Sequence, residues 1–226
     1  MPGAVGAATL VGSALALVVR TAAPEPALMH FAPEPKTALA EGAQPGATFA
    51  PWAQALGPIV VRNANTETEE SIRLYANDGD VDAQQALKFS FLACDGRFGG
   101  GLKTRVIQLA VKAAYHFHAN KMVIVSAYRP MRRGKGGYHA LGQAIDFWLP
   151  GVDFRQLAAY LRTLPKVGVG AYTHPATHFV HVDARDQSYH WLDASPPGVT
   201  WHEKQLGDPG REARDATYTL QSDLPI

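Results

Sequence analysis

Two histidines and one aspartate are the residues of this chain whose types and spacing point most directly to chemistry. His139 and Asp146 lie seven residues apart in the stretch GGYHALGQAIDFW, and His181 follows later in HFVHVDARD. Two imidazoles and one carboxylate are a frequent ligand set for a divalent ion, and three protein ligands leave a fourth position open for water. The three residues therefore predict a catalytic type of zinc site that holds one ion per chain.

The setting of Asp146 favours a ligand over a solvated side chain. Aspartate is a poor strand former, yet Asp146 stands between Ile145 and Phe147 in a stretch that is typical of a half-buried strand. An inward carboxylate needs a partner, because burying an unpaired charge is very costly. The competing interpretation is structural: in a chain with nine histidines, His139 is a loop residue and His181 a hydrogen-bonded strand histidine.

Three further residues are candidates for catalysis. His178 is the first candidate for the general base, since an unperturbed histidine titrates near neutral pH, although strand alternation turns it away from His181. Asp183 is the second candidate; it shares a face with His181, and it is alternatively a group that pairs with Arg185 and orients a ligand. Arg129 ends the stretch SAYRP and is the candidate for holding an oxyanion or a substrate carboxylate.

Strands and helices alternate irregularly around these residues. Apolar residues at helical spacing predict three helices, at 82–94 with Asp82 as N-cap, at 103–117 and at 153–164. Short alternating or apolar runs predict strands at 58–62, 71–75, 121–128, 143–149, 166–172 and 178–184. The first two strands form a hairpin. This order predicts an α+β fold, with a small antiparallel sheet flanked by helices.

The N-terminal end of the chain predicts export, and the segments that flank the predicted domain predict no stable fold. Residues 4–19 form an apolar run of signal-peptide length, so we expect residues 1–23 to be a signal peptide or an N-terminal anchor. Residues 24–57 are rich in proline and alanine and predict a linker, and residues 196–226 predict a polar C-terminal tail. The net charge is +1 and the sequence contains no basic block, so we expect no nucleic-acid partner. No transmembrane partner is predicted.

Three ordered motifs carry a resemblance to a known family. SAYRP, GGYHALGQAIDF and the pair GVGAY and HFVHVDARD resemble the hedgehog/D-Ala-D-Ala zinc metallopeptidase fold, and are most similar to the murein endopeptidase K group. The resemblance implies zinc bound by His139, Asp146 and His181, in a peptidase domain over residues 58–195. It also implies hydrolysis of peptidoglycan stem peptides or cross-links, in the periplasm or cell envelope of a bacterium.

Two other functions compete with the peptidase. The first is a metal-containing binding module of the same fold that docks on the cell wall without activity. It stays open because His178 and Asp183 both remain candidates for the base. The second is an iron oxygenase, since the spacing of His181 and Asp183 matches the start of a facial triad. Only 43 residues follow Asp183, which leaves little chain for the third ligand of such a fold.

Overall fold

The computed structural model describes residues 50–96, 101–130, 137–197, 199 and 204–226. The chain divides between Gln44 and Pro45 into two units, and all described residues belong to the second, Pro45–Ile226, which is compact. The predicted N-terminal segment 1–23 and most of the predicted linker lie outside the described residues. Within the part that is described, no helix combines the length and the apolar character needed to cross a membrane.

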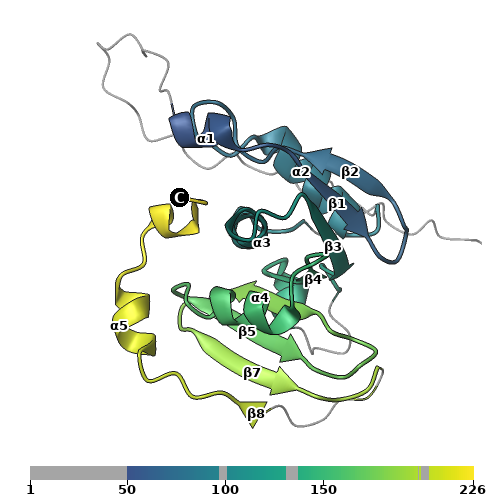
Figure 1. The fold of residues 1–226 in the computed structure, drawn as a ribbon, viewed down its shortest axis with the longest axis vertical. Helices are drawn as coiled ribbons and strands as arrows, with labels where there is room; N and C mark the ends of the chain where they lie inside the picture. Colours follow the sequence, from purple (N-terminus) through teal and green to yellow (C-terminus); the bar gives the residue numbers. More distant parts are fainter. Residues whose placement is uncertain (1–49, 97–100, 131–136, 198, 200–203) are drawn as a thin grey trace, which may run out of the picture. The chain divides into compact units, whose positions relative to one another are not determined.

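A mixed sheet forms the centre of the second unit (Figure 1). Among the described residues it has eight strands in the order β2-β1-β3-β4-β6-β5-β7-β8. The strands are β1 (Ile59–Asn63), β2 (Glu69–Ile72), β3 (Lys121–Ser126), β4 (Ala144–Trp148), β5 (Val167–Tyr172), β6 (Val180–Ala184), β7 (Tyr189–Asp193) and β8 (Lys204–Gln205). β1 pairs with β3 and β5 pairs with β7 in parallel, while the other neighbours are antiparallel.

Helices cover the sheet, and two of them begin at an aspartate that caps the helix. The helical segments are α1 (Pro51–Ala55), α2 (Ala83–Ala93), α3 (Thr104–His116), α4 (Phe154–Leu161), α5 (Arg211–Ala216) and the 3-10 turns η1 (Tyr138–Leu141) and η2 (Leu220–Asp223). The carboxylates of Asp82 and Asp153 accept backbone hydrogen bonds at the starts of α2 and α4, and so satisfy N–H groups that lack helical partners. α3 packs on β4 and β6, and α4 on β5 and β6.

The apolar core lies between these helices and the strands that carry the predicted ligands. Ile145 and Phe147 of β4 and Val180 and Val182 of β6 are fully buried in this core. Side chains alternate between the two faces of a strand, so the residues between them face away from α3 and α4. The strands that position the site are therefore fixed by apolar packing on one face and leave the other face to polar chemistry.

The α+β fold predicted from sequence is confirmed, but the sheet is larger than predicted and mixed. The hairpin of β1 and β2 is present, and the three predicted helices are α2, α3 and α4. The parallel pairs join strands that are not consecutive, as β1 and β3 are separated by β2, α2 and α3. Local periodicity indicates hairpins but carries no signal for such crossover pairs.

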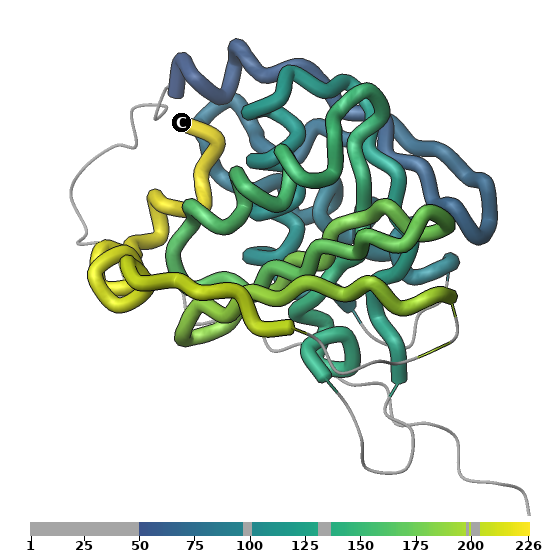
Figure 2. Tube along the Cα trace, turned by 60° about the horizontal axis from the view of Figure 1, so that its bottom comes forward, coloured from purple at the N-terminus to yellow at the C-terminus, as the bar shows by residue number. Residues whose placement is uncertain are grey.

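The folded part also extends further at both ends than the sequence predicts. Proline at the start of α1 and the fully buried Ala53 make residues 50–57 part of the domain instead of the linker. We call residues 204–226 the C-terminal clasp. Figure 2 shows this segment in yellow, leaving the sheet at β8 and ending beside α1.

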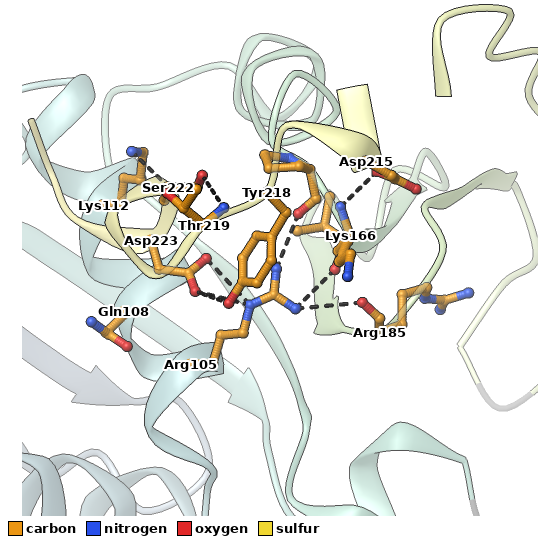
Figure 3. Close-up of polar contacts among 12 residues, drawn as sticks. Arg105, Gln108, Lys112, Lys166, Arg185, Asp215, Tyr218, Thr219, Ser222 and Asp223 are labelled. Atoms are coloured by element: carbon orange, nitrogen blue, oxygen red, sulfur yellow. Dashed lines mark hydrogen bonds and ion pairs between the residues drawn. The ribbon is translucent and has the colours of Figure 1, made fainter. Parts of the chain in front are cut away.

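Polar contacts hold the clasp to α3 (Figure 3). The Arg105 guanidinium donates to the buried Asp223 carboxylate, with Nε 3.0 Å from Oδ2, and the Lys112 ammonium donates to the Ser222 carbonyl at 3.0 Å. Arg105 also donates to the backbone carbonyls of Pro165, Lys166 and Arg185. The segment predicted as a polar tail is therefore a bound part of the domain, because its polar groups have long-range partners.

We predict that the Arg105–Asp223 pair stabilises the clasp. Arg105→Met should lower the free energy of unfolding by about 3 kcal/mol, because it leaves the buried Asp223 charge without its partner. Adding Asp223→Asn should cost much less than in the wild-type background, since the two residues are coupled. Arg62→Met, which breaks a largely exposed pair with Glu67, is the control and should cost under about 1 kcal/mol. Equal, small losses in urea unfolding for Arg105→Met and the control would contradict this role.

Candidate metal centre

Two neighbouring strands and one turn bring the predicted metal ligands together. Asp146 of β4 and His181 of β6 are direct cross-strand partners, so their side chains share the face opposite the core. Asp146 is 4% and His181 6% exposed. His139 comes from η1, which ends at Gly142 in a left-handed conformation. A Cβ at Gly142 would lie 2.0 Å from the Gly101 carbonyl oxygen, so this turn requires glycine.

Three potential ligand atoms converge on one point. His181 Nδ1 lies 2.8 Å from Asp146 Oδ1, and His139 Nε2 lies 3.3 Å from the same oxygen. The two imidazole nitrogens, His139 Nε2 and His181 Nδ1, are 3.2 Å apart. In the described part of the chain, these three residues form the cluster of histidine and carboxylate groups whose ligand atoms all lie within 4.8 Å of one another.

The outer nitrogen of each imidazole fixes which nitrogen faces the cluster. His139 Nδ1 lies 2.5 Å from the Ala127 carbonyl oxygen, and His181 Nε2 lies 3.0 Å from Asp183 Oδ2. A carbonyl and a carboxylate only accept hydrogen bonds, so both outer nitrogens carry hydrogen. The inner nitrogens of the neutral rings then direct lone pairs at the Asp146 carboxylate. Three acceptors that face one another need a cation between them, and this donor set fits zinc.

Without a metal, a proton takes the place of that cation. Burial opposes the charged form of His181, but hydrogen bonds to Asp146 and Asp183 outweigh burial and raise its pKa to about 9. Burial likewise favours a neutral Asp146, but hydrogen bonds with His139 and His181 hold its pKa well below the ordinary value. The metal-free cluster therefore holds a proton on His181, and a bound metal must displace it.

Arg129 stands at the edge of the cluster, as the sequence predicts. Its Nη2 lies 3.2 Å from Asp146 Oδ2, the oxygen that does not face the histidines. Its side chain is 59% exposed. Contact with Asp146 uses one of the five N–H donors of a guanidinium, so the others can meet a substrate oxygen.

Asp183 lies behind His181 and is fully buried. Arg185 Nε donates to Asp183 Oδ1 at 2.6 Å, and Arg185 Nη2 and His181 Nε2 both contact Oδ2. Burial favours the neutral acid, but the hydrogen bonds from Arg185 and His181 lower the pKa of Asp183. A carboxylate with both oxygens occupied and a lowered pKa is a weak proton acceptor. This geometry favours the orienting role that the sequence offers as an alternative.

His178 is not brought to the cluster. It is exposed, has a φ of 40° and stacks on the Phe154 ring at the start of α4, with centroids 5.1 Å apart and planes 9° apart. Phe154 belongs to the core on the helical side of the sheet. The first candidate for the general base therefore lies on the side expected from strand alternation, away from His181.

Strand β7, which packs against the cluster, was not predicted from the sequence. β7 carries Trp191, whose indole lies 5.0 Å from the His181 ring between centroids. Gly170 of β5 is the cross-strand partner of both residues, and a Cβ there would lie 2.4 Å from the indole. The glycines of GVGAY are the sequence signal, because glycine inside a strand often marks close approach by another group.

A family model described as peptidoglycan L,D-endopeptidase MepK, of the M15 peptidases, matches residues 54–191. This span covers more than half of the chain and includes all three potential ligands. The chain belongs to this family. No curated protein and no solved structure matches it significantly.

Membership in the MepK family confirms the resemblance that the sequence motifs carry. It also agrees with the observed α+β architecture of a mixed sheet flanked by helices. The family indicates peptidase action on peptidoglycan, and M15 peptidases are zinc enzymes. Peptidoglycan lies outside the cytoplasm, which agrees with the predicted export.

We predict that zinc binding releases about one proton between pH 7 and 8.5. Because the metal-free pKa of His181 is about 9, zinc affinity should rise about tenfold per pH unit over this range and level off above pH 9. Calorimetry in two buffers of different ionisation enthalpy measures both quantities. His118→Asn, which changes an exposed histidine with positive φ, is the control and should match wild type. A pH-independent affinity with no proton release would contradict a protonated His181.

Proposed function

We propose that this protein is a zinc-dependent peptidase that hydrolyses peptide bonds in peptidoglycan stem peptides or cross-links, acting as an endopeptidase on an L,D bond. The observation that carries the proposal is the convergence of His139 Nε2, His181 Nδ1 and Asp146 Oδ1 on one point beside an exposed arginine. The description of the family model supports the substrate and the type of bond. The proposed location is the periplasm or cell envelope, with the apolar run at residues 4–19 as signal peptide or anchor.

In this proposal, His139, Asp146 and His181 hold the zinc ion. When bound, zinc lowers the pKa of a water molecule and polarises a scissile carbonyl. The protein holds both imidazoles in the required tautomer, through the Ala127 carbonyl and Asp183, so no ring has to turn when the metal enters.

Arg129 is proposed to bind the substrate oxygen that gains negative charge. The Asp146 contact holds its guanidinium, and a hydrogen bond from its backbone N–H to the His139 carbonyl holds its main chain. A preorganised donor costs little reorganisation when charge develops, and removing one such donor typically costs 100- to 1,000-fold in turnover. Asp183 is proposed to orient His181, and Arg185 to hold Asp183.

One observation favours a second candidate function, a wall-binding module that keeps the metal and lacks activity. His178 stacks on Phe154 away from the cluster, and both oxygens of Asp183 are occupied. The fold therefore gives neither sequence candidate the setting of a general base. Hydrolysis by the purified protein decides between the two functions.

The proposed activity is tested by digestion of purified sacculi with the full chain, followed by mass spectrometry of the muropeptides. We expect cross-linked species to decrease, their cleavage products to appear, and a chelator to prevent both changes. Removal of only a terminal D-alanine would show a carboxypeptidase instead. Zinc binding and sacculus binding with unchanged muropeptides would establish the binding module.

We predict that Arg129→Ala keeps zinc affinity within a few-fold but lowers turnover about 100- to 1,000-fold, because an oxyanion donor is lost. Arg129→Lys should recover little of this loss, since a single ammonium cannot match the planar fork. Arg155→Ala, at a largely exposed arginine in the first turn of α4, serves as the matched control and should keep wild-type turnover. Wild-type turnover in Arg129→Ala would remove Arg129 from the proposed mechanism.

A further inference from the structure

A second feature lies beside the metal centre, and its residues other than Arg185 have no role in the hydrolysis proposed above. It is a pocket of about 490 Å³ lined by Tyr138, Arg185, Asp186, Gln187, Ser188, Tyr189 and Arg211. Tyr138 directly precedes the ligand His139, and Arg185 holds the Asp183 carboxylate that contacts His181. The pocket therefore adjoins both segments that carry histidine ligands.

Arg185 is held in one place at the base of this pocket. Its Nε and Nη2 contact the Asp183 carboxylate, and its guanidinium carbon lies 4.4 Å from the centroid of the Tyr138 ring and 5.5 Å from that of Tyr189. The contact with Asp183 uses one edge of the guanidinium, and Nη1 belongs to the other edge. Asp183 balances the charge of Arg185, and the N–H groups of Nη1 are the donors on the edge that Asp183 does not use.

Arg211 reaches the pocket from the C-terminal clasp, outside the span 54–191 that matches the family model. The clasp is fixed there by Asp215, which accepts hydrogen bonds from the backbone N–H of Lys166 and from the N–H and hydroxyl of the buried Ser188 (Figure 3 draws the contact with Lys166). α5 is thereby attached to the turn that follows β6, the strand of His181. This part of the chain adds a positive side chain beside the metal centre.

Arg211 is the cationic group that this pocket can offer to a carboxylate. The ionised side chains that line the pocket are Arg185, Arg211 and Asp186, and Arg185 already pairs with Asp183. Arg211 contacts Glu212 at 3.5 Å, but the Glu212 side chain is 91% exposed, and such exposed pairs are weak. Tyr138 and Tyr189 add hydroxyl donors and flat apolar walls. The His181 imidazole and the Asp183 carboxylate lie between Arg185 and the candidate metal position, so a group bound in this pocket would not contact the metal.

We propose that this pocket is a substrate subsite that binds a free carboxylate of the peptide next to the scissile bond, with Arg211 as its cationic group and Nη1 of Arg185 as a further donor. The inference rests on the proposed function, because it assigns the pocket to the substrate of the same metal centre. It makes the C-terminal clasp a determinant of specificity as well as a structural element.

The test compares peptides that differ only in whether one carboxylate is free or amidated. The full zinc-loaded chain is titrated by calorimetry with stem peptides in which each free carboxylate is amidated in turn. At one of the carboxylates of the peptide, wild type should bind the free acid about tenfold more tightly than the amide. One charge-assisted hydrogen bond accounts for a difference of this size. Arg211→Gln should reduce that ratio to about twofold or less.

Two controls separate the subsite from folding and from hydrolysis. Arg155→Gln removes an exposed arginine on α4 and should keep the wild-type ratio, and the melting temperature of Arg211→Gln should match wild type because its contact with Glu212 is exposed. Equal affinity of wild type for every acid and amide pair, or an unchanged ratio in Arg211→Gln, would overturn the subsite. Because binding needs no turnover, a chain that binds selectively but cleaves nothing would retain the subsite and reject the peptidase.

Discussion

Convergence of three acceptor atoms on one buried point is the constraint around which this domain is arranged. His139 Nε2, His181 Nδ1 and Asp146 Oδ1 lie 2.8–3.3 Å apart, and lone pairs at such distances repel one another unless a cation lies between them. The Ala127 carbonyl and the Asp183 carboxylate enforce this arrangement, because each holds the hydrogen of one imidazole on its outer nitrogen. In the metal-free protein a proton on His181 supplies the charge.

One row of cross-strand partners in the sheet positions Asp146 and His181. Asp146, His181, Gly170 and Trp191 are successive partners on β4, β6, β5 and β7. Apolar packing against α3 and α4 fixes the opposite face, so the row has little freedom to relax. The missing side chain at Gly170 lets the indole approach His181 and shield it from water. Low dielectric strengthens the electrostatic contact between Asp146 and His181, the two buried polar members of the row.

Much of this site could be predicted because its residues break local rules. An aspartate inside an apolar strand and a histidine on the matching face of another strand indicated two candidate ligands, and the nearby glycine-containing turn indicated a third candidate, His139. The C-terminal clasp and β7 could not be predicted in the same way. Asp215 and Asp223 lie in a stretch whose composition is typical of a surface tail. They hold the clasp in place because distant residues bind them: Ser188 donates to Asp215, and Arg105 pairs with Asp223. Long-range pairing of polar groups leaves no periodic signal in a sequence.

The most direct test of the metal centre is the zinc affinity of Asp146→Asn, measured by competition with a chelator together with the melting temperature of the metal-free protein. If Asp146 is a ligand, the affinity should fall by more than about 100-fold, a greater loss than is typical for groups that only orient a ligand. The metal-free variant should still unfold cooperatively, and Asp80→Asn at an exposed site should bind zinc like wild type. Wild-type zinc affinity in Asp146→Asn would contradict the metal centre and leave Asp146 as a structural partner of Arg129.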